Sequence, residues 1–258
     1  MKQKSKLIDV WGELGITKHF GGVYATQQLI ELCDIRSGLH VLEIGCGTGY
    51  TACLLAKKYD ANVAAVDINS KILEVAKKRA VEEGVSDKVK IIEADAEELP
   101  LLSNTFDVAI AESVLSLCDS KKVASEMYHI LKPNGVFGAN EATYLRAPPE
   151  ELRTFISGSL GGLLLQESEW RAVFKEAGFV NLASRVYPVN SWKQFTSYFK
   201  VDGARKIIFA VIRMIFDSTI REVYFKKEAP KVSREFLSYA GYGLYVGKKP
   251  HIRNKQEK

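Results

Sequence analysis

The sequence predicts an α/β protein built on a doubly wound parallel sheet. Between residues 39 and 143, short apolar and β-branched runs alternate with amphipathic helical stretches, which is the pattern of repeated βα units joined by right-handed crossovers. The run VLEIGCGTGY at 41–50 places three glycines within five positions directly after an apolar stretch. A glycine turn between a strand and a helix is typical of sites for nucleotide-like ligands.

Five runs in this region predict buried strands because they are almost continuously apolar. They are HVLEI (40–44), NVAAVD (62–67), KVKIIEA (88–94), FDVAIAES (106–113) and GVFGANEAT (135–143). Two further strands are expected towards the C-terminus, NLASRVYPV (181–189) and YGLYVGKKP (242–250).

Five stretches with apolar residues three and four positions apart predict the helices. They are GGVYATQQLIELCDI (21–35), TACLLAKKY (51–59), SKILEVAKKRAVEEG (70–84), KKVASEMYHIL (121–131) and SEWRAVFKEAGF (168–179). Asn69 or Ser70 is expected to cap the helix that ends at Gly84. The residues Lys132-Pro133-Asn134-Gly135 predict a type I turn before the next strand.

Four parts are expected along the chain. They are an N-terminal helical cover (1–38), the α/β core (39–189), a helical insertion or lid (190–240), and the final strand with a basic tail (241–258). The third part is too long for a plain connection and must hold structure of its own. Its run KIIFAVIRMIF (206–216) is apolar almost all round except at Arg213, and residues 145–165 predict a second lid.

Composition indicates a globular protein rather than a membrane-spanning or disulfide-rich one. The chain has 258 residues, of which 47% are hydrophobic and 26% charged, and it lacks an apolar run long enough to span a bilayer. Asp9 and Glu13 interrupt the N-terminal stretch before an apolar signal core forms, so we expect a cytoplasmic location. The four cysteines show no CxxC spacing, and no metal site is expected.

The spacing of the glycines distinguishes this turn from a dinucleotide site. In the pattern G-x-G-x-x-G the third glycine would stand at position 50, which is Tyr50. The glycines present are Gly45, Gly47 and Gly49. Glu43, just before the turn, would repel a pyrophosphate and attract a cation. We therefore expect a ligand with an amino group or a sulfonium. Cys46, within the turn, is interpreted as a small turn residue rather than a reactive thiol.

Acidic residues follow at the ends of the next three strands. Asp67 can accept hydrogen bonds from ribose hydroxyls, and Ile68 beside it can pack on an adenine face. Asp95-Ala96 ends the third strand, where the carboxylate can accept from an exocyclic amine, and Glu112-Ser113 ends the fourth. Open α/β sheets bind their ligands at the carboxyl ends of the strands, so these residues are expected to converge on one ligand.

Five stretches, in their order and spacing, resemble the successive motifs of class I S-adenosylmethionine-dependent methyltransferases, small-molecule type. They are VLEIGCGTG, VAAVDIN, EADAEELP, FDVAIAESVL and ILKPNG. The resemblance covers about residues 20–143. It implies a doubly wound, seven-stranded Rossmann-like methyltransferase sheet with a reversed hairpin at its end and helical lid insertions. It also implies S-adenosyl-L-methionine as cofactor, with S-adenosyl-L-homocysteine as product.

The resemblance also implies where the cofactor lies. The methionine part is expected over Gly45 to Gly49, the ribose at Asp67 and the adenine between Ile68 and Asp95-Ala96. The stretch HFGGVYATQQLIELCDI (19–35) resembles the segment that helps to cover the cofactor in this group. The expected cofactor-binding residues are Glu43, Gly45, Cys46, Gly47, Gly49, Asp67, Ile68, Asp95, Ala96, Glu112, Ser113, Gly22 and Thr26.

The sequence does not identify the catalytic residue. Methyl transfer is an in-line displacement that correct positioning of the reactants accelerates, and a general base is needed only when the acceptor arrives protonated. The candidates are His19, just ahead of the Gly21-Gly22 pair, Tyr24, and Glu141, which faces the same region if the strand alternation holds.

The acceptor is expected to be a small apolar or aromatic molecule. After the fourth strand the sequence reads AESVLSL, without the [DNS]-P-P-[YFW] turn of DNA amino-methyltransferases, so no nucleic acid partner is expected. The segment 190–240 is rich in aromatic residues, among them Trp192, Phe195, Tyr198, Phe199, Phe209, Phe216, Tyr224, Phe225 and Phe236. Residues 190–258 also contain 15 Lys and Arg against 6 Asp and Glu. These features leave open contact of 190–240 with a membrane surface, or a position of 206–216 in the core or in a homodimer interface.

Three other functions are alternatives. A cyclopropane-forming lipid enzyme would use the same cofactor and fold on a carbon acceptor. A non-catalytic protein would bind S-adenosylmethionine without turnover. An NAD-dependent dehydrogenase is disfavoured by the glycine spacing and by Glu43.

Overall fold

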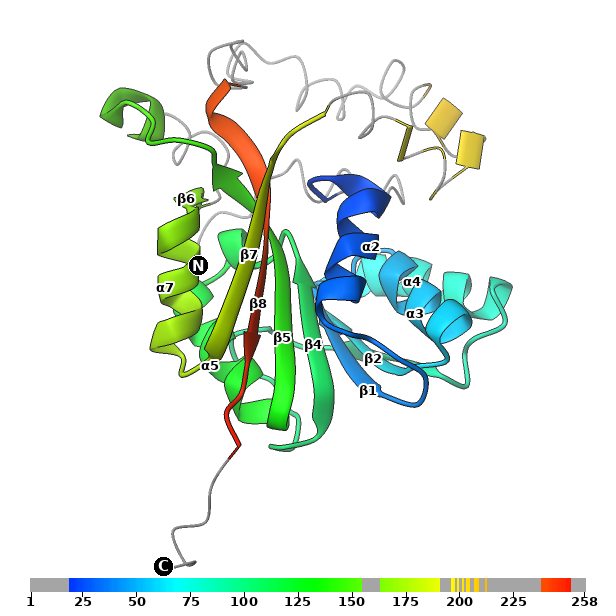
Figure 1. Cartoon of the computed structure of the whole chain (residues 1–258). Helices are drawn as coiled ribbons and strands as arrows, with labels where there is room; N and C mark the ends of the chain where they lie inside the picture. The colour runs from blue at the N-terminus through cyan, green and yellow to red at the C-terminus, as the bar shows by residue number, and fades with distance from the viewer. Residues whose placement is uncertain are drawn as a thin grey trace, which may run out of the picture.

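A twisted, mostly parallel sheet forms the centre of the protein (Figure 1). The computed structural model describes residues 19–154, 163–190, 196–197, 199, 201, 203–204, 207–208, 212 and 238–251. The strands are β1 (His40–Ile44), β2 (Asn62–Asp67), β3 (Val89–Glu93), β4 (Phe106–Glu112), β5 (Leu131–Tyr144), β6 (Leu165–Gln166), β7 (Val180–Pro188) and β8 (Ala240–Lys248). Their order is β3-β2-β1-β4-β5-β8-β7, and the short β6 pairs with β5.

The direction of the strands confirms the expected doubly wound sheet with a reversed hairpin. The pairings among β1 to β6 are parallel, whereas β8 runs antiparallel to both β5 and β7. All of the parallel strands therefore point their carboxyl ends at one edge of the sheet, where α/β proteins bind ligands.

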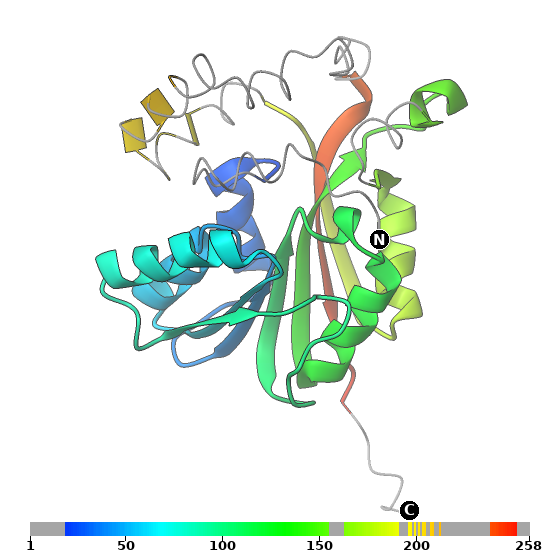
Figure 2. The same ribbon diagram turned by 180° about the vertical axis from the view of Figure 1, so that it is seen from behind.

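Helices cover both faces of the sheet (Figures 1 and 2). The first face carries α2 (Gly22–Leu32), α3 (Tyr50–Tyr59) and α4 (Ser70–Glu82), and the second carries α5 (Ser120–Ile130) and α7 (Glu167–Glu176). Each face has its own apolar core: Leu29 and Leu55 belong to the first, and Met127 and Trp170 to the second. Successive strand residues face opposite sides, so the near-continuous apolar runs of the sequence fill both cores.

The helix ends follow the local sequence. The side chain of Asn69 accepts the backbone N–H groups of Lys71 and Ile72 and so caps α4, which decides between the two predicted caps. Gly84 follows α4 with φ of +69°, the left-handed conformation that glycine favours at a helix C-terminus.

The type I turn expected at 132–135 is wrong. Strand β5 begins at Leu131, which pairs with Phe106, and the register then jumps to the pair Val108 and Val136. Residues 132–135 therefore form an irregularity within the strand rather than a separate turn. The extra residues are held by the residue that follows β8, because Asn134 N–H donates to the carbonyl of Lys249 (3.0 Å).

Most of the predicted lid 190–240 lies outside the described residues. This applies to much of the run 206–216 and to all of the named aromatic residues except Phe199, which is exposed. The described residues between 196 and 212 are helical. The part boundaries 1–38, 39–189, 190–240 and 241–258 stay predictions.

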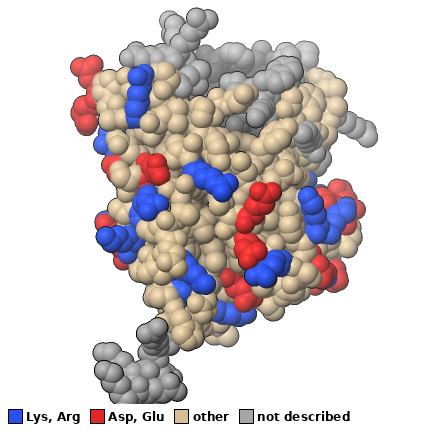
Figure 3. All heavy atoms as spheres, viewed as in Figure 1, with Lys and Arg blue, Asp and Glu red and all other residues tan. Residues whose placement is uncertain are grey.

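Surface charge is mixed on the face that Figure 3 shows, where Lys and Arg side chains lie among Asp and Glu side chains. Within the described ranges, no helix is both long enough and apolar enough to cross a bilayer.

Candidate functional site

The glycine turn between β1 and α3 adopts a backbone conformation that only glycine enters freely. Gly45 and Gly47 have φ of +63° and +51°, in the left-handed region. A Cβ atom at position 45 would overlap the side chain of Val114, whereas a Cβ atom at position 47 would lie 3.8 Å from its nearest neighbour among the described residues, Ile72 Cδ1. Gly45 thus allows close packing within the protein, and Gly47 leaves room for a ligand to approach the backbone.

Two other residues of the turn serve its packing. Gly49 precedes α3 and lies so close to α4 that a Cβ atom on it would be 2.9 Å from Ala76 Cβ. Cys46 is buried, and its N–H donates to the carbonyl of Val66 (2.9 Å). Burial raises the pKa of the Cys46 thiol well above its ordinary value. A protonated thiol is a poor nucleophile, which is in keeping with a turn residue.

Asp67, at the end of β2, ties the second strand to the glycine turn. Its Oδ2 accepts the N–H of Gly47 (3.0 Å), and its Oδ1 accepts the N–H of Asn69 (3.0 Å). Each carboxylate oxygen can accept more than one hydrogen bond, so Asp67 retains capacity for hydroxyl donors. Ile68 beside it is 47% exposed, which leaves an apolar surface at the place expected for adenine.

Within the described part of the chain, Glu43 carries a buried carboxyl oxygen without a partner. The residue is 4% exposed, and no described residue donates a hydrogen bond to its Oε2. Burial and then the negative charge of Glu112 raise the pKa of Glu43 well above its ordinary value, and the N–H of Ala52 opposes them. A buried acceptor normally has a donor, so this position suits a cationic or hydrogen-donating ligand group.

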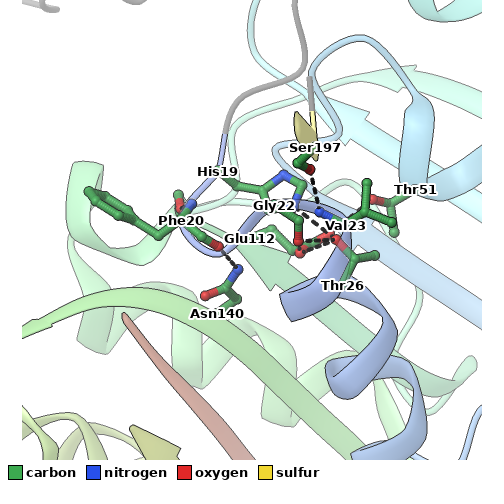
Figure 4. Close-up of polar contacts among 10 residues, drawn as sticks. His19, Phe20, Gly22, Val23, Thr26, Thr51, Glu112, Asn140 and Ser197 are labelled. Atoms are coloured by element: carbon green, nitrogen blue, oxygen red, sulfur yellow. Dashed lines mark hydrogen bonds and ion pairs between the residues drawn. The ribbon is translucent and has the colours of Figure 1, made fainter. Parts of the chain in front are cut away.

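Glu112, at the end of β4, is the centre of a buried polar cluster (Figure 4). Its Oε2 accepts the hydroxyl of Thr26 (2.9 Å), and its Oε1 accepts the hydroxyl of Thr51 (2.9 Å). His19 Nε2 lies 3.4 Å from Glu112 Oε2 and 2.9 Å from Thr26 Oγ1. The cluster therefore joins the loop before α2, helix α3 and strand β4 around one carboxylate.

The loop that carries His19 is pinned to the ends of two strands. Phe20 N–H donates to Ser113 Oγ (3.3 Å), and Asn140 Nδ2 donates to the carbonyl of Phe20 (2.7 Å). Ser113 has φ of +60°, and its N–H donates to the carbonyl of Asn140 (2.7 Å). His19 is thus held in place by backbone contacts and is itself buried.

Two described residues of the segment 190–240 contact this site. Ser197 Oγ accepts the N–H of Val23 (2.8 Å), and a Cβ atom on Gly22 would overlap the Ser197 side chain. Arg79 donates from Nε to the carbonyl of Thr48 in the glycine turn (3.0 Å) and from Nη1 to the carbonyl of Val201 (3.4 Å). The segment therefore reaches the edge of the site at both α2 and α4.

The third strand end is less buried. Asp95 Oδ1 accepts the N–H of Glu97 (2.9 Å), and Ala96 is buried in the second core. Asp95 is exposed, so its remaining oxygen is accessible to an amine donor.

Glu141 does not lie in the region of His19, contrary to expectation. Asn140 faces α2, so the next residue along β5 faces the opposite side of the sheet. There the carboxylate of Glu141 accepts the N–H groups of Val114 (2.9 Å), Leu115 (2.8 Å) and Ser116 (3.2 Å). Side chains do alternate between the two faces along β5, but the sequence does not show which face of the sheet Glu141 occupies.

Tyr24 also lies apart from the Glu112 cluster. It is 38% exposed and lines a cavity of about 380 Å³ between α2 and the ends of β7 and β8, together with Tyr187 and Tyr242. Among the three catalytic candidates, His19 contacts two predicted cofactor residues, Glu112 and Thr26.

Sequence reasoning missed four residues of the site: Thr51, Asn140, Arg79 and Ser197. Thr51 stands in the first turn of α3, directly after the glycine turn, and this position is a signal that the sequence contains. The contacts of the others depend on the tertiary fold. Among the described residues, no group of His, Cys, Asp or Glu side chains is arranged to hold a metal ion.

Comparison with known proteins identifies the family. The family described as "Methyltransferase domain" matches residues 42–139. The uncharacterized methyltransferase YodH of Bacillus subtilis is 30% identical over 180 residues, which are 69% of this chain and 75% of YodH. The chain belongs to the family of class I S-adenosylmethionine-dependent methyltransferases, and S-adenosyl-L-methionine is the cofactor of that family.

Other relatives match over shorter shares of their length. The methyltransferase GfsG of Streptomyces halstedii is 38% identical over 44% of this chain and 41% of GfsG. The sterol 24-C-methyltransferase erg6 of Aspergillus fumigatus is 35% identical over 56% of this chain and 41% of its own length. The matched region thus spans about two fifths of each of these two proteins.

Solved structures match the fold over nearly the whole chain. The [4+2]-cyclase SpnF superposes with a TM-score of 0.75 at 21% identity, covering 97% of this chain and 96% of SpnF. A methyltransferase from Thiobacillus denitrificans in complex with S-adenosyl-L-homocysteine superposes with a TM-score of 0.69 at 19% identity, covering 96% of this chain and 99% of the methyltransferase. Because one of these proteins is named as a cyclase, the shared fold alone does not define the reaction.

The buried carboxyl of Glu141 predicts a pH-dependent stability. Burial raises the pKa of Glu141 from its ordinary 4.5 to about 7, so the folded protein binds this proton more tightly than the unfolded chain. The contribution is fully present below the unfolded pKa and is lost as the pH rises through about 7. Between about pH 5 and about pH 8, the free energy of unfolding should fall by up to about 3 kcal/mol relative to Glu141→Gln. Urea denaturation of both proteins across this range measures it, and a pH-independent difference would contradict the expectation.

Proposed function

We propose that this protein transfers a methyl group from S-adenosyl-L-methionine to a small apolar or aromatic acceptor. The observation that carries the proposal is Glu112, whose side chain is 6% exposed and whose two oxygens are fixed by the hydroxyls of Thr26 and Thr51 (2.9 Å each). It lies on the face of the sheet that also carries Glu43 with its unpartnered oxygen. Two buried carboxyl groups beside a glycine turn suit a ligand that bears positive charge.

The residues present fit the parts of this cofactor. Asp67 would accept hydrogen bonds from the ribose hydroxyls, while Ile68 and Asp95-Ala96 would contact the adenine. Glu43 and Glu112 would face the cationic methionine part. When bound, the cofactor supplies a methyl group on a positive sulfonium. The glycine turn and the acidic residues would hold that group in one orientation, which is the main requirement for an in-line displacement.

His19 is the residue that we propose for accepting a proton from the acceptor. Contact of Nε2 with Glu112 favours the tautomer that carries the proton on Nε2, which makes Nδ1 the basic nitrogen. Glu112 would then stabilise the imidazolium that forms. This role applies to acceptors with an O–H or N–H group and is not required for a carbon nucleophile that is already activated.

The acceptor class is supported by relatives and by the composition of the segment 190–240. One relative is named as a sterol 24-C-methyltransferase, which indicates an apolar substrate for that protein. In this chain the described residues Phe199, Ile208 and Ile212 of that segment expose apolar side chains. Contact of 190–240 with a membrane surface, and a position of 206–216 in the core or in a homodimer interface, stay predictions.

A product assay tests the proposal. The protein is incubated with S-adenosyl-L-methionine and a panel of sterols, quinones, phenols and unsaturated lipids, and S-adenosyl-L-homocysteine is measured. We expect its formation with at least one apolar acceptor, together with a product that carries one additional methyl group. Loss of alkene signals in the product would instead indicate a cyclopropane-forming enzyme. Tight cofactor binding without turnover across the panel would favour a non-catalytic binding protein.

A further inference from the structure

The carboxyl group of Glu141 accepts hydrogen bonds from three consecutive backbone amides in the turn that follows β4. Its Oε1 accepts the N–H groups of Val114 (2.9 Å) and Leu115 (2.8 Å), and its Oε2 accepts the N–H of Ser116 (3.2 Å). The side chain is fully buried. A buried carboxyl group costs stability unless donors surround it, so the three amides account for its presence in the core.

The residues that Glu141 holds form a wall of the proposed cofactor site. Residues 114–116 follow directly after Glu112-Ser113, and Ser113 has φ of +60°. The side chain of Val114 fills the space above Gly45, because a Cβ atom at position 45 would overlap it. On the outer side, the carbonyl of Ser116 accepts the N–H of Leu163 (2.7 Å). The turn therefore connects the buried Glu141 with the backbone of the glycine turn.

A carboxyl group suits this position better than a carboxamide of the same size. The carboxamide of glutamine has one acceptor oxygen and an NH₂ group that only donates. In Glu141→Gln, the NH₂ group would face at least one of the three amide donors. The backbone of 114–116 would then shift, and Val114 would shift with it against Gly45.

We propose that Glu141 is a positioning residue for cofactor binding, which holds Val114 against the glycine turn by ordering the backbone of residues 114–116. The role rests on the proposed cofactor site. It differs from that of a catalytic residue, because the carboxyl group lies on the opposite face of β5 from Asn140. Glu141 would affect the ligand only through residues 114–116.

The test compares Glu141→Gln with a matched control on the same strand face. Thr143, two residues along β5, contacts the hydroxyl of Tyr245 (2.9 Å) and donates to the backbone carbonyl of Glu141 (3.0 Å). Thr143→Val removes both of these buried contacts but keeps the Glu141 carboxyl group that accepts the three amides of the turn. Affinity for S-adenosyl-L-homocysteine is measured by calorimetry, and stability by urea denaturation. We expect Glu141→Gln to weaken binding about tenfold or more, because a displaced Val114 would no longer hold the ligand in its correct position. Thr143→Val should bind within about twofold of the wild type although it is destabilised.

A second variant keeps the test decisive if Glu141→Gln does not fold. Val114→Ala leaves Glu141 and its three contacts in place but removes the side chain above Gly45, and it should also weaken binding. Wild-type affinity in Glu141→Gln, or in Val114→Ala if the first variant does not fold, would overturn the positioning role. Absence of binding by the wild type would instead overturn the proposed cofactor site, so the two failures are distinguishable.

Discussion

Replacing Gly47 with alanine is expected to weaken binding of S-adenosyl-L-homocysteine about 100-fold, whereas replacing Gly84 with alanine should leave it nearly unchanged. Gly47 and Gly84 have similar φ values, +51° and +69°, so both substitutions impose comparable backbone strain of about 1–2 kcal/mol. Neither would clash with a described residue, because the nearest described atom to a Cβ on Gly47 lies at 3.8 Å and none lies within 4 Å at Gly84. The two variants therefore differ mainly in whether the new methyl group occupies the ligand's path.

Calorimetric titration of the two variants, with urea denaturation as the measure of strain, separates binding from stability. If Gly47→Ala and Gly84→Ala lose the same stability and both bind like the wild type, the ligand does not approach the backbone at Gly47. The proposed position of the cofactor would then have to be abandoned.

Glu112→Gln is expected to weaken binding of S-adenosyl-L-methionine about 30-fold. The substitution keeps the size of the side chain but removes the negative charge, and hydrogen bonds to charged groups are worth about 1.5–3 kcal/mol. It also places an NH₂ group opposite one of the two threonine hydroxyls that now donate to the carboxylate (2.9 Å each). The threonine hydroxyls can rotate, so the fold should survive.

Asp107→Asn is the matched control for this loss of charge. Asp107 lies near the opposite end of β4, where it pairs with Lys132 Nζ (2.7 Å) and accepts the N–H of His40 (2.9 Å). Removing its charge changes the net charge of the protein equally but should leave affinity for S-adenosyl-L-methionine within about twofold. Equal affinities of Glu112→Gln and Asp107→Asn would show that Glu112 does not face the cation.

The central part of the fold follows from patterns that are local in the sequence. Runs such as NVAAVD are apolar at nearly every position because the strand is buried between two helical layers, and β2 has the predicted bounds Asn62–Asp67. The cap of α4 is also local, since Asn69 bonds to residues two and three positions along the chain. The carboxyl ends of parallel strands then bring Glu43, Asp67 and Glu112 to one edge of the sheet.

The features that escaped prediction depend on register and on distant contacts. The face of Glu141 is set by the register of β5 after the irregularity at 132–135, and no local pattern fixes that register. Ser197 meets Val23 across 174 positions of sequence, and Asn140 meets Phe20 across 120. Such contacts form only when the sheet has been assembled, so residue type alone does not reveal them.

The most direct measurement is a calorimetric titration of the wild-type protein with S-adenosyl-L-homocysteine and, separately, with NAD. The acidic residues at the strand ends and the glycine spacing predict binding of S-adenosyl-L-homocysteine and no binding of NAD. Binding of NAD without binding of S-adenosyl-L-homocysteine would contradict the assignment of the glycine turn and of the reaction proposed for it.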